Sequence, residues 1–247
     1  MAQDTTIDGL LDRRVMLEQP ANGYRVAVDT VLLAAAVHAE AGQKALDLGC
    51  GAGGALLCLA CRVPGVMIRG VEIQNDLAQL CRANIVRNNF ATDVDAYTAD
   101  ATDLPHDLES IFDHTFMNPP YHEESRHDVS AHGQKRTANS EKSGDLALWI
   151  AAVAKALKPT GLITLIHRAD RLDELLGLLQ AGFGAIEILT ILPKAGAAPK
   201  RIILRARKGA PSGVTNCRNF VLHQADGRYT EEAEAVLRHM KVLLFLK

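Results

Sequence analysis

The sequence has 247 residues, a length that suits one large α/β domain and makes a metal or disulfide staple unnecessary. With 48% apolar and 23% charged residues, the composition is that of an ordinary globular protein, which excludes the disordered and collagen-like classes. The formal net charge of −2 argues against a general polyanion binder and leaves room for a local basic patch.

No membrane segment and no secretory signal are expected. The longest mainly apolar stretches, residues 31–37 and 146–157, are shorter than the roughly 20 residues that cross a bilayer. The N-terminal residues carry Asp4, Asp8 and Asp12 without the apolar core of a secretory signal. We therefore expect a cytoplasmic protein with no membrane partner.

Short apolar runs alternate with helical periodicity in the centre of the chain. After an N-terminal segment of residues 1–40, the runs at 44–49, 67–73, 94–100 and 114–118 are predicted strands, and helical segments separate the first three. This alternation is typical of a parallel sheet that is covered by helices on both faces.

The later runs predict that the sheet is mixed. Residues 162–167, 185–192 and 202–206 have strand character. A short segment without a helix joins the last two of them, so these two strands are expected to pair antiparallel.

A glycine-rich turn follows the first predicted core strand. In Ala45-Leu-Asp-Leu-Gly-Cys-Gly-Ala-Gly-Gly54, missing side chains at a helix start let a ligand approach the backbone. Gly49, Gly51 and Gly54 also satisfy the GxGxxG pattern of dinucleotide-binding dehydrogenases. Asp47 favours another ligand, because an acidic side chain here would repel a pyrophosphate but suits a cation such as the ammonium group of S-adenosylmethionine.

At this point the sequence resembles the class I S-adenosylmethionine-dependent methyltransferases. In that class a D-x-G-x-G stretch and acidic residues at the ends of the second and third strands line the cofactor, and Asp47, Glu72 and Asp100 stand in those places. The resemblance implies a Rossmann-like seven-stranded mixed sheet with the last strand antiparallel and helices on both faces. It also implies an approach segment (1–40), a methyltransferase domain (41–210) and a C-terminal extension packed on the same domain (211–247).

The resemblance gives each cofactor-binding residue a role. Gly49 and Gly51 approach the methionine part of S-adenosylmethionine, Glu72 bonds the ribose hydroxyls, and Asp100 with Ala101 receives the adenine ring. The residues alone leave alternatives open, since Asp100 could cap a strand end and Glu72 could be a solvated edge carboxylate.

The tetrapeptide Asn118-Pro-Pro-Tyr121 follows an apolar strand and carries the predicted chemistry. An amino nitrogen conjugated to a base or carbonyl is a poor nucleophile. Acceptors on its two hydrogens draw it towards tetrahedral geometry and stabilise the positive charge that develops during methyl transfer. We assign the Asn118 side-chain oxygen and the Pro119 carbonyl as acceptors, Pro120 as the stiffener and Tyr121 as the stacking plate. The alternative is a turn that only ends a strand.

The long polar stretch at 122–145 has no periodic apolar face and is expected to be a substrate-side loop. Its histidines share neither a helical nor a strand face. Cys58 and Cys61 form a CxxC pair, but no second pair stands at zinc-site spacing, so packing is the favoured reading. No metal site is therefore expected.

The flanking segments narrow the resemblance. Residues 23–33, 166–172, 199–209 and 227–232 look like parts of the bacterial family that methylates adenine N6 next to the anticodon of a valine tRNA. The chain departs from that family at residues 138–141, where Ala-Asn-Ser-Glu replaces an Ala-Arg-His-Glu-like segment and removes a basic contact.

A basic set near the end of the predicted sheet is compatible with an RNA backbone, and equally with a charged edge hairpin that avoids aggregation. Its members are Lys194, Lys200, Arg201, Arg205, Arg207 and Lys208.

The predicted function is methyl transfer from S-adenosylmethionine to the exocyclic N6 of an adenine in RNA, with tRNA as the expected substrate. The same tetrapeptide occurs in guanine-N2 ribosomal RNA methyltransferases and in release-factor glutamine methyltransferases. The glutamine enzymes usually carry an N-terminal helical domain, for which residues 1–40 are short. A cofactor-binding module without catalysis is a third alternative, but it gives no reason for the tetrapeptide.

Overall fold

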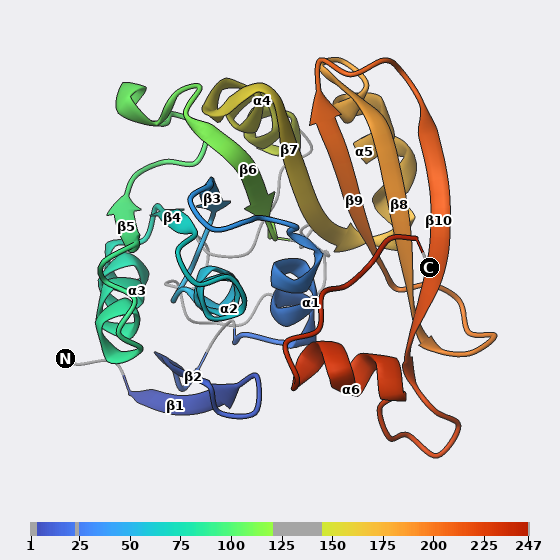
Figure 1. The fold of residues 1–247 in the computed structure, drawn as a ribbon, viewed down its shortest axis with the longest axis horizontal. Coiled ribbons are helices and arrows are strands. Elements are labelled where there is room, and N and C mark those ends of the chain that lie inside the picture. Colours follow the sequence, from blue (N-terminus) through green and yellow to red (C-terminus); the bar gives the residue numbers. More distant parts are fainter. Residues whose placement is uncertain (1–3, 23–24, 121–144, 247) are drawn as a thin grey trace, which may run out of the picture.

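The computed structural model of the protein describes residues 4–22, 25–120 and 145–246, and within them a central sheet is flanked by helices (Figure 1). The described strands of this sheet are β3 (Lys44–Leu48), β4 (Met67–Glu72), β5 (Val94–Thr98), β6 (Phe112–Met117), β7 (Leu157–Arg168), β8 (Phe183–Lys194), β9 (Arg201–Lys208) and β10 (Val214–His223). Their order across the sheet is β10-β8-β9-β7-β6-β3-β4-β5. The four predicted central strands therefore lie together.

The mixed α/β sheet is confirmed, with two differences from the expected pattern. β9 is antiparallel to β7 and to β8, as predicted for residues 185–192 and 202–206. The first difference is that the described residues contain an eighth strand, β10, where seven strands were expected. The second difference is that this last strand runs parallel to its neighbour β8, where the last strand was expected to be antiparallel. β10 lies at the sheet edge, and Phe220 is its one fully buried residue. A strand with so little burial does not need alternating apolar residues, so the sequence pattern did not predict it.

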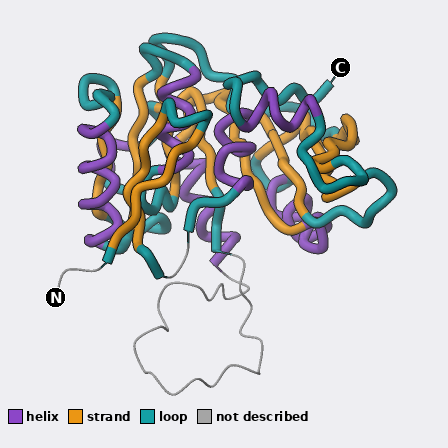
Figure 2. The backbone as a smooth tube through the Cα atoms, turned by 90° about the horizontal axis from the view of Figure 1, so that it is seen from below, coloured by secondary structure: helices purple, strands orange, loops and turns teal. Residues whose placement is uncertain are grey.

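Helices cover both faces of the sheet, as the sequence predicts. Figure 2 turns the molecule by 90° and shows the helices packed beside the strands. One face carries α1 (Val28–Ala36), α2 (Gly54–Arg62), α3 (Asn75–Arg87) and α6 (Glu231–Leu237), and the other carries α4 (Asp145–Ala156) and α5 (Leu172–Leu179). Two short 3-10 helices cover His106–Leu108 and Ala169–Arg171. No helix of the described part has the length and hydropathy needed to cross a membrane.

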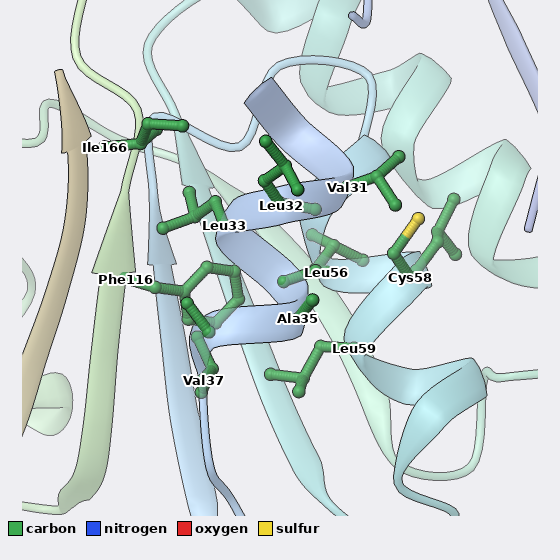
Figure 3. Close-up of a cluster of buried hydrophobic side chains, with 14 of the residues drawn as sticks. Val31, Leu32, Leu33, Ala35, Val37, Leu56, Cys58, Leu59, Phe116 and Ile166 are labelled. Carbon is green, nitrogen blue, oxygen red and sulfur yellow. The ribbon is translucent and has the colours of Figure 1, made fainter. Parts of the chain in front are cut away.

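α1 is buried almost all round, because it packs against the sheet, α2 and α6. Its residues from Thr30 to Ala36 are all buried, as expected for a helix with apolar residues on every face. Figure 3 shows Leu33 beside Phe116 of the sheet and Leu56 of α2 in the same cluster. This packing brings the residues before α1 against the start of α2, where a Cβ on Gly54 would lie 2.7 Å from Cγ2 of Val26.

The N-terminal segment contains a hairpin that the sequence analysis did not predict. β1 (Thr5–Leu10) pairs antiparallel with β2 (Val15–Pro20), with Leu10 opposite Val15. Val15 and Leu17 are fully buried, whereas Ile7 is 54% exposed. β2 packs against α2 and α3. The hairpin therefore rests on the helices next to the glycine-rich turn.

Candidate active site

The carboxyl ends of neighbouring parallel strands meet at one edge of the sheet. β3 lies between β4 and β6, with Leu48 opposite Val71 on one side and Met117 on the other. The chain passes from β3 outwards to β4 and β5, and then returns to place β6 on the other side of β3. Such a reversal of strand order is the place where open α/β sheets bind ligands.

The glycine-rich turn after β3 is held by β4. Gly49, Gly51 and Gly53 have φ values of 74°, 55° and 95°, which are costly for residues with a Cβ. The backbone N–H groups of Gly49 and Cys50 donate to the carbonyl oxygen of Val71 at 2.8 and 3.0 Å. A Cβ on Gly51 would have no heavy atom within 4 Å. Hydrogen bonds to β4 thus fix the start of the turn, and the space beside Gly51 is open, so a ligand can approach the backbone there.

Asp47 is only 2% exposed and lies under the first turn of α2. Its Oδ2 accepts a hydrogen bond from the backbone N–H of Leu56 at 3.2 Å. Burial is the main cause that raises the pKa of Asp47 to about 8; the Leu56 N–H opposes this shift, and the negative charge of Glu72 adds to it. At neutral pH the carboxyl therefore holds a proton unless a cation lies beside it, which fits the binding of a positively charged ligand group.

Glu72, at the end of β4, joins the turn to the start of α3. Its Oε2 accepts from the N–H of Gly51 at 3.0 Å, and its Oε1 accepts from the N–H of Gln74 at 2.9 Å. Each carboxylate oxygen keeps a second lone pair that can accept from a hydroxyl group. The next residue, Ile73, is 62% exposed, so an apolar surface that the sequence analysis missed stands beside the carboxylate. An apolar residue directly after the acid was the signal available for it.

Asp100 and Ala101 lie beyond the end of β5, which is not adjacent to β3. Asp100 is exposed, and its Oδ1 accepts from both the N–H and the hydroxyl of Thr102 at 2.8 Å. Ala101 is buried in the core on the α4 and α5 side of the sheet. Hydrogen bonds thus connect the end of β4 to the glycine turn and connect Asp47 to α2. The side chain of Asp100 bonds Thr102, two residues further along the chain.

The predicted acceptor residues follow β6 directly. Pro119 is buried, and Asn118 and Pro120 are half-buried. Because Met117 pairs with Leu48, Asn118 and Gly49 follow paired positions at the same sheet edge. Tyr121 and the expected substrate-side loop up to residue 144 lie outside the residues that the structure describes.

Trp149 of α4, the only tryptophan in the sequence, covers the glycine turn from the other face of the sheet. A Cβ on Gly49 would lie 2.5 Å from Cη2 of its ring. Trp149 is partly exposed and packs against the α4 and α5 core. No spacing in the sequence relates it to the turn, because the contact depends on how α4 docks on the sheet.

We expect Gly49→Ala to destabilise the protein by about 2 kcal/mol or more and to shift the fluorescence of Trp149, because backbone strain adds to a clash. Gly51→Ala is the matched control: it has the positive φ but no clash, and it should cost only about 1 kcal/mol without changing the emission. Thermal unfolding and emission spectra of the free variants measure both effects. Equal shifts in the two variants would contradict the contact.

The basic set does not form one surface. Arg201 pairs with Asp29 at 2.7 Å near the carboxyl edge, whereas Arg207, at the opposite end of β9, donates to the carbonyl oxygen of Thr160.

Arg205 and Lys208 make contacts within the fold. The Nε of Arg205 lies 2.6 Å from Glu187, and its guanidinium lies over the ring of Phe245 at 4.3 Å. Lys208 donates to the carbonyl oxygens of Ala154 and Leu157. These residues therefore stabilise the sheet more directly than they offer a path for a phosphate backbone.

In the described residues, no group of three or more His, Cys, Asp or Glu side chains is placed to hold a metal ion. Cys58 of the CxxC pair is fully buried in the core, and burial raises its pKa to about 12. Its thiol is therefore held in the neutral form by its apolar surroundings.

The central sheet and the helices on its two faces have the fold of class I methyltransferases. A solved predicted O-methyltransferase of Agrobacterium tumefaciens has a TM-score of 0.73 at 22% identity, with 87% of this chain and 98% of that chain covered. A tRNA methyltransferase of Aquifex aeolicus has a TM-score of 0.56 at 17% identity, with 78% and 73% covered. These structures support the fold.

Residues 24–190 match the family described as "Methyltransferase small domain", and the chain belongs to this family. It is a methyltransferase, and its cofactor is S-adenosylmethionine. A relative in Porphyromonas gingivalis is 31% identical over 89% of this chain and 89% of its own length. A relative in Shewanella baltica is 26% identical over 87% and 91%. Both relatives are named tRNA1(Val) (adenine(37)-N6)-methyltransferase.

Proposed function

We propose that the protein transfers a methyl group from S-adenosylmethionine to the exocyclic N6 of an adenine in tRNA. The observation that carries the proposal is the pairing of β3 with β6, in which Leu48 lies opposite Met117. The pairing puts the start of the acceptor tetrapeptide at the same sheet edge as the glycine-rich turn. A site with both parts can hold a methyl donor and an amino nitrogen side by side.

The cofactor-binding part of the proposal uses the groups at the ends of β3 and β4. Asp47 would hold the ammonium group, the turn at Gly49 and Gly51 would hold the methionine part, and Glu72 would accept hydrogen bonds from the ribose hydroxyls. Asp100 and Ala101 are proposed for the adenine end. Bound S-adenosylmethionine supplies an electrophilic methyl group on a positively charged sulfur. The buried carboxyl and the open glycine cradle fit such a ligand.

The acceptor part of the proposal needs no general base before the methyl group moves. The bond from nitrogen to the methyl carbon forms as the bond from sulfur to that carbon breaks, S-adenosylhomocysteine leaves, and the nitrogen then loses its extra proton to water. The Asn118 side-chain oxygen and the Pro119 carbonyl accept hydrogen bonds from the two N–H groups of the adenine. Positive charge grows on that nitrogen during transfer, so these acceptors bind the transition state more strongly than the ground state. Pro120 restricts the turn, and Tyr121 is proposed to stack on the base.

The names of the relatives refine the substrate. Because they are described as acting on adenine 37 of a valine tRNA, we propose the same nucleotide for this chain. RNA-modifying proteins generally take an unstacked base from a single-stranded loop, which suits an anticodon-loop position.

The direct test is incubation with isotopically labelled S-adenosylmethionine and one of four acceptors: total tRNA, ribosomal RNA, release factor, or a valine tRNA transcript. We expect label in total tRNA and in the transcript, recovered as N6-methyladenosine, and none in a transcript with guanosine at position 37. Label in ribosomal RNA or release factor and none in tRNA would contradict the proposed substrate and identify the labelled molecule as the substrate instead. No label with any acceptor would contradict the proposal.

A further inference from the structure

Asn84 of α3 is a fully buried polar residue that joins two parts of the molecule far apart in sequence. Its Nδ2 donates to the carbonyl oxygen of Ala52, in the glycine-rich turn, at 3.0 Å. The same nitrogen donates to the carbonyl oxygen of Glu18 in β2 at 2.7 Å, and its Oδ1 accepts from the N–H of Glu18 at 2.9 Å. One amide therefore bonds both the turn and the N-terminal hairpin.

Asn88, one helical turn further along α3, repeats only the hairpin half of this arrangement. Its Oδ1 accepts from the N–H of Met16 at 2.8 Å, and its Nδ2 donates to the carbonyl oxygen of Met16 at 2.8 Å. Met16 and Glu18 present their backbone groups to the same side because they are two residues apart in a strand. The two asparagine side chains thus make the backbone hydrogen bonds that a neighbouring strand would make with β2. Of the two, Asn84 also bonds the turn.

The peptide unit between Ala52 and Gly53 is the part of the turn that most needs such support. It lies between Gly51 and Gly53, where the backbone has the greatest freedom to rotate. Its N–H donates to the carbonyl oxygen of Cys50 at 2.9 Å, and its carbonyl oxygen accepts from Asn84. Gly53 also rests on α3, since a Cβ there would lie 2.7 Å from Sγ of Cys81.

We infer that Asn84 is a positioning residue for cofactor binding: through the Ala52 carbonyl it holds the glycine turn in its binding conformation, and it ties that conformation to the hairpin. Asn84 does not itself touch the cofactor. The inference rests on the cofactor assignment and is independent of which RNA is methylated. A turn released from Asn84 populates other orientations of the 52–53 peptide unit, and the cofactor then binds to a smaller fraction of the molecules.

The test compares Asn84→Ala with the matched control Asn88→Ala. Both remove hydrogen bonds to β2, so both should lower the midpoint of thermal unfolding. For S-adenosylhomocysteine, measured by calorimetry without RNA, we expect the dissociation constant to rise about tenfold in Asn84→Ala, equal to about 1.4 kcal/mol. In Asn88→Ala it should stay within about twofold of the original protein, because the turn keeps its contact with Asn84.

A second readout needs no ligand. Because the ring of Trp149 covers Gly49, a loosened turn should shift the emission of this single tryptophan in the Asn84 variant and leave it unchanged in the Asn88 variant. If Asn84→Ala does not fold, Asn84→Asp decides the question, since it keeps an acceptor for the Glu18 N–H but cannot donate to Ala52. Asn88→Asp is then its control.

Equal changes of the dissociation constant in the Asn84 and Asn88 variants, or no change in either, would overturn the inference. This outcome is separate from failure of the proposed function. A protein that binds S-adenosylhomocysteine with the expected difference between variants but methylates no tRNA would keep the role of Asn84 and lose the proposed substrate.

Discussion

Asn118→Ala is expected to lower the rate of methyl transfer about 100- to 1,000-fold, the usual cost of removing one group that stabilises transition-state charge. The affinity for S-adenosylhomocysteine should change less than about twofold, because the residue acts on the amino nitrogen and not on the cofactor. Single-turnover rates with saturating tRNA, together with calorimetry of the cofactor product, separate the two quantities.

Asn118→Asp is the matched control for the acceptor role. Its carboxylate keeps an oxygen at the same position but lacks the amide N–H groups, so it should be clearly more active than Asn118→Ala. Equal loss of activity in the two variants would show that the amide donates instead of accepting. Loss of cofactor binding together with activity would contradict the assigned role.

Asp47→Asn is expected to stabilise the free protein at alkaline pH while weakening cofactor binding. The folded-state pKa of Asp47 is raised to about 8, above its value in an unfolded chain. The stability that this proton gives is fully present below the unfolded-state pKa and is lost as pH rises through about 8. The loss amounts to up to about 1.4 kcal/mol for each pH unit between the two values. An asparagine resembles the protonated acid, so the variant should lose this part of the pH dependence.

Cofactor binding should show the opposite preference. A positively charged group beside Asp47 favours the ionised carboxylate, so binding releases a proton and the affinity of the original protein rises with pH up to about 8. In Asp47→Asn the affinity at pH 8 should fall about tenfold or more, as expected for removal of one partner of a buried charge pair, and no such proton should be released. Calorimetry in buffers of different ionisation enthalpy measures this release. The same release from both proteins would contradict the assignment.

The central strands could be predicted from the sequence because a parallel strand buried on both faces needs a continuous apolar run. Residues 44–49 and 114–118 correspond to β3 and β6 on this ground. The missed elements are held differently. β10 is an edge strand with little burial. In β2, the backbone groups on the side away from β1 are hydrogen-bonded by the side chains of Asn84 and Asn88 and not by another strand. Periodicity of apolar residues contains neither kind of information.

The residues of the candidate site also fall into two groups, those that the sequence predicts and those that only the packing of the fold brings to the site. Asp47, Gly49 and Gly51 lie within one short stretch, where charge and missing side chains together indicate a ligand-binding turn. Trp149 and Asn84 come from distant helices, and their contacts with the turn depend on the packing of α4 and α3. A helix position alone predicts burial, but it does not say which backbone group a buried amide will meet.

The proposed function requires the turn after β3 to hold the methyl donor next to the end of β6. A crystal structure of the protein with S-adenosylhomocysteine would show this arrangement directly. We expect the amino-acid part to contact the turn at Gly49 and Gly51, the ribose to lie against Glu72, and the sulfur to face Asn118 and Pro119. The product bound at any other part of the surface, or an Asn118 amide turned away from the sulfur, would contradict it.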